Sequence, residues 1–153
     1  VRHAAVTVPA GVDNGSRLRV TGEGERVYAD IPPGDLYVTV HVEPHPFYER
    51  VAQNLLTKVS ITVFTAMLGG QVDVQLLGGG SVKVTVPQGV QPGQRLRITG
   101  HGMPILNQPG KRGDLIVALD LTTPDLSAEQ RALIQKVVDM SKVDEKLRSS
   151  KLP

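Results

Sequence analysis

The sequence has 153 residues, of which 40% are hydrophobic and 21% are charged, a composition typical of a globular chain rather than a disordered one. It contains no cysteine, which excludes disulfides, thiolate zinc sites and cysteine nucleophiles within these residues. The net charge of +2 is too small to predict a nucleic-acid partner, and no apolar run approaches the roughly 18 residues of a membrane helix, so we expect no membrane partner either.

The first part of the chain is predicted to hold three short strands. Residues 6–8 alternate apolar and polar side chains, the period of a strand, and Pro9 ends that segment. Residues 13–15 have the composition of a turn, because Asn and Gly accept a positive φ angle. Alternation returns over residues 17–20 and 36–42, which are predicted to be the second and third strands.

The middle of the chain is predicted to contain three more strands and one helical turn. Residues 58–63 and 71–76 alternate cleanly and are typical of strands. Between them, residues 65–69 form a short helical turn that two glycines end. The triple glycine at 78–80 then turns the chain into a strand over residues 81–86.

An internal repeat organises these elements. Val6–Gly24 returns as Val84–Gly102 with 13 of 19 positions identical, and Gly34–Leu36 returns as Gly113–Leu115. The sequence therefore predicts two copies of one β unit. The first copy has no counterpart of the strands that precede residue 81, so we expect the chain to begin part-way through the first unit.

A last strand is predicted over residues 115–121, and one helix follows it. Ser127 is a suitable N-cap, and Gln130 three residues later completes a capping box. Apolar residues then recur at helical spacing, at Leu133, Ile134, Val137 and Val138. This stripe has two interpretations, packing on the sheet of its own subunit or packing across a two-fold axis. From Ser141 onward the chain is charged, and we expect it to fray.

The ordered motifs resemble the C-terminal substrate-binding region of the DnaJ-type co-chaperones, the J-domain proteins. The resemblance covers residues 4 to about 140. The segments that carry it are Val8–Val12, Gly22–Gly24, Gly34–Val38, His45–Arg50, Ala66–Gly70, Val82–Pro87, Gly100–Met103, Arg112–Leu115 and Thr123–Arg131.

The resemblance implies a mainly β fold with two tandem, small, β-sandwich-like domains, the first incomplete at its N-terminus, followed by a C-terminal helix. The implied divisions are residues 1–52, 53–125 and 126–153, the last being a helix and tail that join two subunits. Such proteins resemble a horseshoe that receives unfolded polypeptides and delivers them to a DnaK-type ATP-dependent chaperone. The resemblance implies a cytoplasmic protein, with an organelle matrix as the alternative. Any zinc would lie in an upstream module, with no cofactor in these residues.

The resemblance also implies two sets of site residues. A shallow apolar pocket for the client matches positions Ala4, Val6, Val38 and Val40. These four also fit a plain core, because alternating valines in strands usually pack inward. The implied dimerisation residues are Leu133, Ile134, Val137 and Val138.

Nothing in the sequence predicts an enzyme, and we expect no catalytic residue and no metal ligand. The four histidines lack the spacing of metal ligands. His45–Phe47 is similar to the His-Pro-Asp signature of a J domain, but it follows a strand and is interpreted as structural. By resemblance, the chain should therefore not stimulate the ATPase of the partner chaperone. The repeated Gly-Asp pairs are interpreted as turns in which Asp caps backbone N–H groups.

Two other classes of function remain open from the residues. A structural β-repeat scaffold would need no client groove. A β-sandwich enzyme or carbohydrate binder would need an aromatic platform, whereas this sequence has no Trp and three Tyr.

Overall fold

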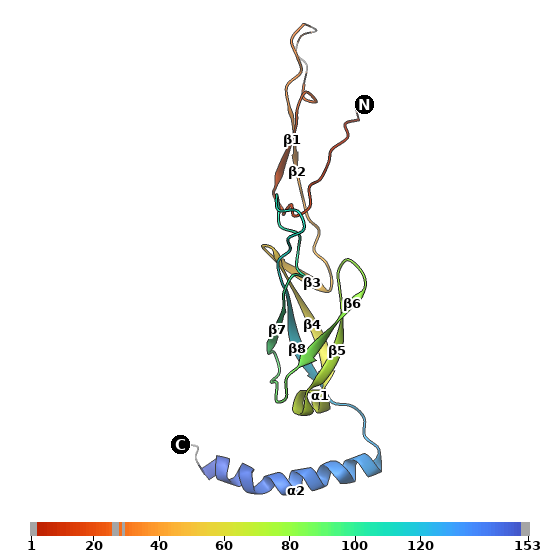
Figure 1. Ribbon diagram of the computed structural model, residues 1–153, viewed down its shortest axis with the longest axis vertical. Helices are drawn as coiled ribbons and strands as arrows, with labels where there is room; N and C mark the ends of the chain where they lie inside the picture. Colours follow the sequence, from red (N-terminus) through yellow and green to blue (C-terminus); the bar gives the residue numbers. More distant parts are fainter. Residues whose placement is uncertain (1–2, 26–27, 29, 151–153) are drawn as a thin grey trace. The chain divides into compact units, whose positions relative to one another are not determined.

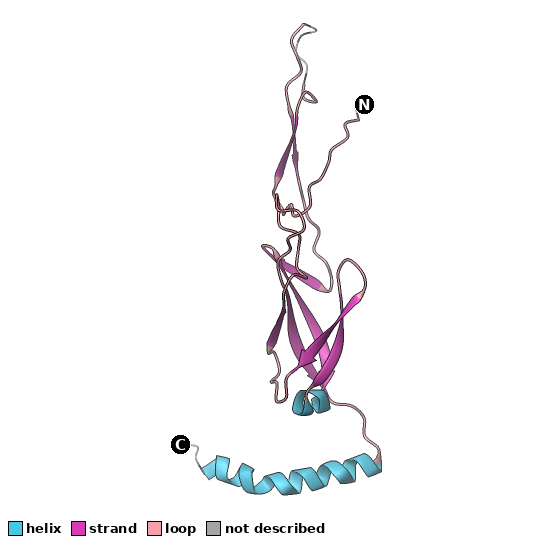
Figure 2. Cartoon of the chain, viewed as in Figure 1, coloured by secondary structure: helices cyan, strands magenta, loops and turns pink. Residues whose placement is uncertain are grey.

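The computed structural model describes residues 3–25, 28 and 30–150 (Figure 1). Within them the chain forms eight strands and two helices, coloured by type in Figure 2. They are β1 (Arg17–Val20), β2 (Leu36–Thr39), β3 (Tyr48–Val51), β4 (Asn54–Thr62), α1 (Val63–Leu68), β5 (Gly70–Gln75), β6 (Ser81–Val86), β7 (Arg95–Ile98), β8 (Leu115–Thr122) and α2 (Ala128–Ser150). The predicted mainly β fold with a C-terminal helix is confirmed.

The first copy of the repeat contributes the two-stranded antiparallel sheet β1–β2. Its register places Leu18 opposite Val38 and Val20 opposite Leu36. These four side chains are half-buried, whereas the residues between them are exposed. Strict alternation therefore gives the hairpin one apolar face and one polar face.

Two strand predictions in the first copy need correction. Residues 6–8 form no strand, and Val8 is 59% exposed. Their counterparts in the second copy lie in β6, which pairs along its whole length with β5. No counterpart of β5 precedes residue 6, so this segment has no ladder to join. The third strand ends at Thr39 instead of residue 42, and the Val42 N–H donates to the Asn14 side chain instead, at 3.1 Å.

The second copy contributes the four-stranded sheet β3–β4–β8–β7 and the hairpin β5–β6. Their apolar residues form one core in which Leu115, Val117 and Leu119 of β8 are at most 1% exposed. The other buried members are Leu55, Ile61, Ala66, Val74, Val86 and Val90. Helix α1 begins two residues before the predicted turn because the Thr62 hydroxyl caps it, accepting from the Thr65 N–H at 3.3 Å.

Strand β3 was not predicted, and it pairs with β4 through a tight turn at Ala52 and Gln53. Ala52 adopts a φ of 54°, a conformation that favours glycine. The turn packs against the second copy's own glycine motif. Met103 donates its N–H to the Gln53 carbonyl at 2.9 Å, and Leu55 donates to the Asp114 carbonyl at 3.0 Å.

Arg50 ties the beginning of the first copy to β3. Its guanidinium donates to the Val12 carbonyl at 2.6 Å and to the Gly11 carbonyl at 3.1 Å, and its Nε donates to the Ala52 carbonyl at 2.8 Å. Gly11 itself lies against the loop that contains Pro104, so that a Cβ there would come within 2.6 Å of the Pro104 carbonyl oxygen. Backbone contacts on two sides therefore hold this turn.

The chain divides into two compact units, residues 1–121 and 122–153. The division into 1–52, 53–125 and 126–153 stays a prediction. In the second unit the predicted capping box is present: Gln130 donates its N–H to Ser127 Oγ at 3.1 Å, and Ser127 donates its N–H to Gln130 Oε1 at 2.9 Å.

The prediction that helix α2 frays from Ser141 is wrong, because the helix continues to Ser150. Residues 141–150 contain neither glycine nor proline and are rich in helix formers, so nothing in the sequence interrupts the helix. No helix in the described part of the chain is both long enough and apolar enough to cross a membrane.

Candidate functional site

The first candidate site is the apolar face of the β1–β2 hairpin. Val6 lies beside β1, where residues 5–7 and Pro9 line a shallow depression together with Leu18 and Val20. Val38 shares this hairpin face, since it lies opposite Leu18, and Val40 follows two residues later and is half-buried. The structure thus brings Val6, Val38 and Val40 to one hairpin. Ala4 is exposed and does not line the depression.

The segment next to this face has unused hydrogen-bonding groups. Among the described residues, none forms a backbone hydrogen bond with residues 6–8. Strand addition of an extended peptide needs such groups, together with apolar surface for alternate side chains. Both features occur here within one short stretch of chain.

A turn motif is repeated with the same geometry in both copies. In the first, Arg19 donates to the Asp35 carboxylate at 2.6 Å, and that carboxylate also accepts from the Gly22 N–H at 3.1 Å. In the second, Arg97 donates to Asp114 at 2.5 Å, and the Gly100 N–H donates to it at 3.2 Å. The predicted capping role of the two aspartates is confirmed.

These contacts lower the pKa of both aspartates below the usual range. The Gly22 N–H is the larger cause for the pKa of Asp35, with Arg19 next, and the Arg97 guanidinium is the larger cause for the pKa of Asp114. Each carboxylate is held ionised by groups that it stabilises in return. This is the chemistry of a turn, because the lowered pKa removes any general-base or general-acid role near neutral pH.

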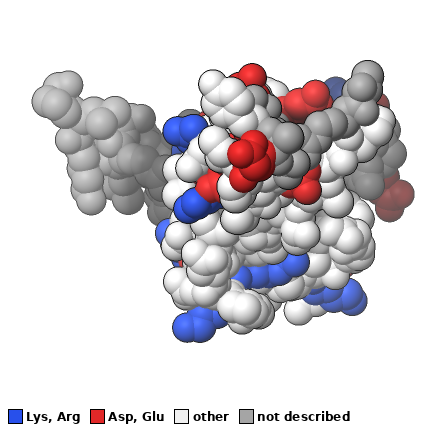
Figure 3. Space-filling view, turned by 90° about the horizontal axis from the view of Figure 1, so that it is seen from above, with Lys and Arg blue, Asp and Glu red and all other residues white. Residues whose placement is uncertain are grey.

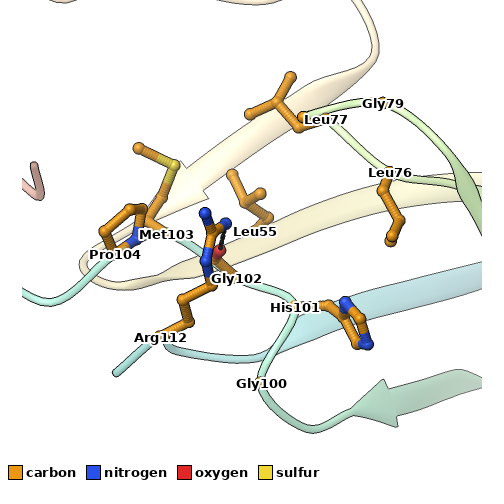
Figure 4. A pocket seen from close by; sticks show the side chains of 11 residues that line it. Leu55, Leu76, Leu77, Gly79, Gly100, His101, Gly102, Met103, Pro104 and Arg112 are labelled. Atoms are coloured by element: carbon orange, nitrogen blue, oxygen red, sulfur yellow. Dashed lines mark hydrogen bonds between the residues drawn. The ribbon is translucent and has the colours of Figure 1, made fainter. Parts of the chain in front are cut away.

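A second candidate site lies in the second copy, between the β5–β6 hairpin tip and the loop after β7. Figure 4 shows its side chains, with Leu55, Leu76 and Met103 around the hollow and Leu77 on the hairpin tip. The volume is about 480 Å³. Arg112 enters from below and donates to the Gly102 carbonyl at 3.4 Å.

A neighbouring depression of about 460 Å³ shares Leu55, Leu77 and Met103 with the first. Sequence reasoning did not predict either depression. One signal was present: Leu76 and Leu77 are adjacent leucines before the triple glycine, so alternation cannot bury both. Leu77 is accordingly 44% exposed. Nothing in the sequence indicated that Met103 would meet it.

The predicted dimerisation residues lie on helix α2. Leu133, Val137 and Val138 are 56%, 59% and 42% exposed, and Ile134 is half-buried. Three large apolar side chains are therefore open to a partner on this helix, although dimerisation itself stays a prediction.

His45–Phe47 lies in the loop between β2 and β3. The Phe47 N–H donates to His45 Nδ1 at 3.1 Å, and the His45 ring meets the Tyr48 ring edge-on at 5.2 Å. The tripeptide shapes the entry to β3, in agreement with the structural interpretation.

Charged side chains of both signs are distributed over the surface. On the face in Figure 3, Lys and Arg side chains share the surface with Asp and Glu, and no single sign covers it. A phosphate-binding surface would instead concentrate cations along one face.

Duplicated small β sheets with a shared turn motif, apolar depressions and a capped terminal helix define the class: a tandem β module suited to binding extended polypeptide. The DnaJ C terminal domain family matches residues 1–124. The chain therefore belongs to the DnaJ C-terminal domain family, and the resemblance found in the sequence is confirmed.

Curated relatives agree with this family. The chain is 42% identical over 147 residues, 95% of its length, to the "Chaperone protein DnaJ" of Zymomonas mobilis, of which this region is 39%. It is 41% identical over 150 residues to the protein of the same name from Brucella anthropi, covering 97% of the chain and 40% of that protein. The chain spans about two fifths of the length of these relatives.

Proposed function

We propose that this chain binds non-native polypeptide segments on the apolar face of the β1–β2 hairpin. In a DnaJ-type co-chaperone it would then pass them to a DnaK-type ATP-dependent chaperone. The observation that carries the proposal is the half-buried aliphatic face beside a segment, residues 6–8, whose backbone is free to pair. Family membership supports the same conclusion.

The proposed binding mode is strand addition. An extended client supplies backbone N–H and C=O groups whatever its sequence, which suits a site that must accept many clients. Alternate client side chains would enter the depression lined by Val6, Leu18 and Val20. Aliphatic contacts then give modest affinity without demanding one sequence.

Helix α2 is proposed to join two copies of the chain through Leu133, Ile134, Val137 and Val138. A dimer would present two client sites to one polypeptide, and the effective concentration of the second site would strengthen binding. The proposal includes no catalytic residue, metal or cofactor in these residues, and a cytoplasmic location.

The test is suppression of aggregation of a chemically unfolded model protein by the 153-residue chain. Val6→Asp and Val38→Asp should each weaken suppression several-fold, because a carboxylate on the face opposes burial of client side chains. Thr39→Asp is the matched control, since Thr39 is exposed on the opposite face of the same strand. It should retain suppression.

Val6→Asp guards against a trivial result, because residue 6 lies outside every strand and cannot unfold the hairpin by losing a ladder contact. Full suppression by both face variants, with folding verified by circular dichroism, would overturn the proposal. A folded chain that binds no apolar peptide would instead favour the structural β-repeat scaffold.

A further inference from the structure

The depression of about 460 Å³ between the first copy's turn and the second copy has a preformed apolar floor. Tyr48, Leu55, Leu77 and Met103 line it from the second copy, and Val42 and Pro44 line it from the connecting segment. Its volume falls within the about 300–1,000 Å³ that is usual for ligand sites. Leu77 and Val42 are 44% and 41% exposed, so large apolar side chains remain accessible there.

Hydrogen bonds fix the walls of this depression. The Tyr48 hydroxyl donates to the Gln75 carbonyl at 2.6 Å, and the His45 ring packs edge-on against the Tyr48 ring. On the opposite side, the Asn14 side chain accepts from the Val42 N–H at 3.1 Å. These polar groups already have partners, so the floor offers apolar contact from a rigid frame.

The rim of the depression is acidic. The carboxylates of Asp13, Glu43 and Glu49 line it, and Arg50 is the one Lys or Arg among its lining residues. Arg50 is 16% exposed, and its guanidinium already serves backbone carbonyls and lies 3.7 Å from Asp13. Within the described part of the chain, neither Glu43 nor Glu49 has an ion-pair partner. Two carboxylates beside the apolar floor are therefore uncompensated.

We propose that this depression binds an extended polypeptide segment in which a large apolar side chain is flanked by Lys or Arg. This rests on the proposed function, because it assigns a class of client segment to a second site. The apolar side chain would contact Leu77 and Met103. Side chains of adjacent residues in an extended chain point to opposite sides, and the long stems of Lys and Arg let their charges reach Glu43 and Glu49. The same carboxylates repel acidic segments and phosphates.

The experiment measures binding of three fluorescent peptides to the 153-residue chain by anisotropy. The peptides share one apolar core and differ in flanks of Lys, Ser or Glu. The Lys-flanked peptide should bind tightest and the Glu-flanked peptide weakest. Glu43→Gln combined with Glu49→Gln should weaken the Lys-flanked peptide by about fivefold and leave the Ser-flanked peptide within about twofold. Raising the salt concentration should have a similar effect.

Asp120→Asn combined with Asp125→Asn is the matched control. It removes the same total charge from exposed positions that do not line the depression. It should leave the preference for Lys flanks unchanged. Leu77→Ser should weaken the Lys-flanked peptide without affecting the fold, because Leu77 is largely exposed at a hairpin tip.

The possible outcomes separate this inference from the proposed function. Equal binding of all three peptides, or an undiminished preference in the Glu43 and Glu49 double variant, would overturn the inference and leave client binding intact. An equal loss in the control double variant would also overturn it, since net charge alone would then account for the preference. Binding of none of the peptides would count against the proposed function as well.

Discussion

The two copies of the repeat carry the same turn in different surroundings. In each copy, an arginine pairs with the aspartate before the next strand, and that aspartate accepts from a glycine N–H. The strand that follows is buried in the second copy, where Val117 is 0% exposed, but its counterpart Val38 in the first copy is half-buried. The repeated residues thus specify the turn locally, whereas burial depends on which strands are present to cover the face.

The largest expected difference between the copies concerns one leucine. Leu115 is 1% exposed within the core, and Leu36 occupies the same repeat position while only half-buried. Leu115→Ala should lower the free energy of unfolding by about 3 kcal/mol, because it leaves a cavity in a closed core. Leu36→Ala should lower it by about 1 kcal/mol or less. Urea denaturation followed by circular dichroism measures both. Equal losses would contradict the difference in burial.

A glycine pair tests close packing. A Cβ added at Gly113 would lie 2.1 Å from the Gln53 carbonyl oxygen, whereas one at Gly34 would have its nearest neighbour, the Glu25 carbonyl oxygen, at 3.9 Å. Gly113→Ala should therefore lower the free energy of unfolding by about 1–3 kcal/mol through displacement of the β3–β4 turn. Gly34→Ala should change it by no more than about 0.5 kcal/mol. The melting temperatures of the two variants provide the comparison, and similar melting temperatures would mean that the turn moves away without cost.

The same pair of copies shows how far the sequence could predict the fold. Alternation and the repeat predicted β1, β5, β6 and the capped start of α2, because these depend on local periodicity and side-chain capping. Residues 6–8 alternate just as well but form no strand, since pairing needs a neighbour that their sequence does not encode. Strand β3 was missed for the opposite reason: it is four residues long and is defined by its partner β4.

The candidate sites divide in the same way. The face that contains Val38 and Val40 follows from alternation within one strand, so the sequence could predict it. The depression at Leu77 and Met103 joins a hairpin tip to a loop that lies beyond another strand. Their meeting depends on the packing of β5–β6 and on the Met103 bond to Gln53. Pairwise packing of this kind leaves no periodic signal in a single sequence.

The smallest expected effect tests whether the two Arg–Asp turns are equivalent. The pKa of Asp35 and that of Asp114 are both lowered from the ordinary value of 3.8 in the folded chain. The unfolded chain therefore takes up protons at a higher pH than the folded chain does. Each carboxylate contributes stability that is fully present above its ordinary pKa and is lost as the pH falls through its lowered pKa.

Asp35→Asn and Asp114→Asn should each flatten part of the fall in unfolding free energy between about pH 5 and about pH 2.5, because the amide does not titrate. The two decreases in slope should be similar, since the hydrogen-bond partners and the side-chain exposures of 19% and 20% nearly match. Carboxyl NMR titration of the unaltered chain measures the two pKa values directly. A lowered pKa at Asp114 with an ordinary one at Asp35 would mean that the Arg–Asp turn needs the second copy's core, which would contradict its local specification by the repeated residues.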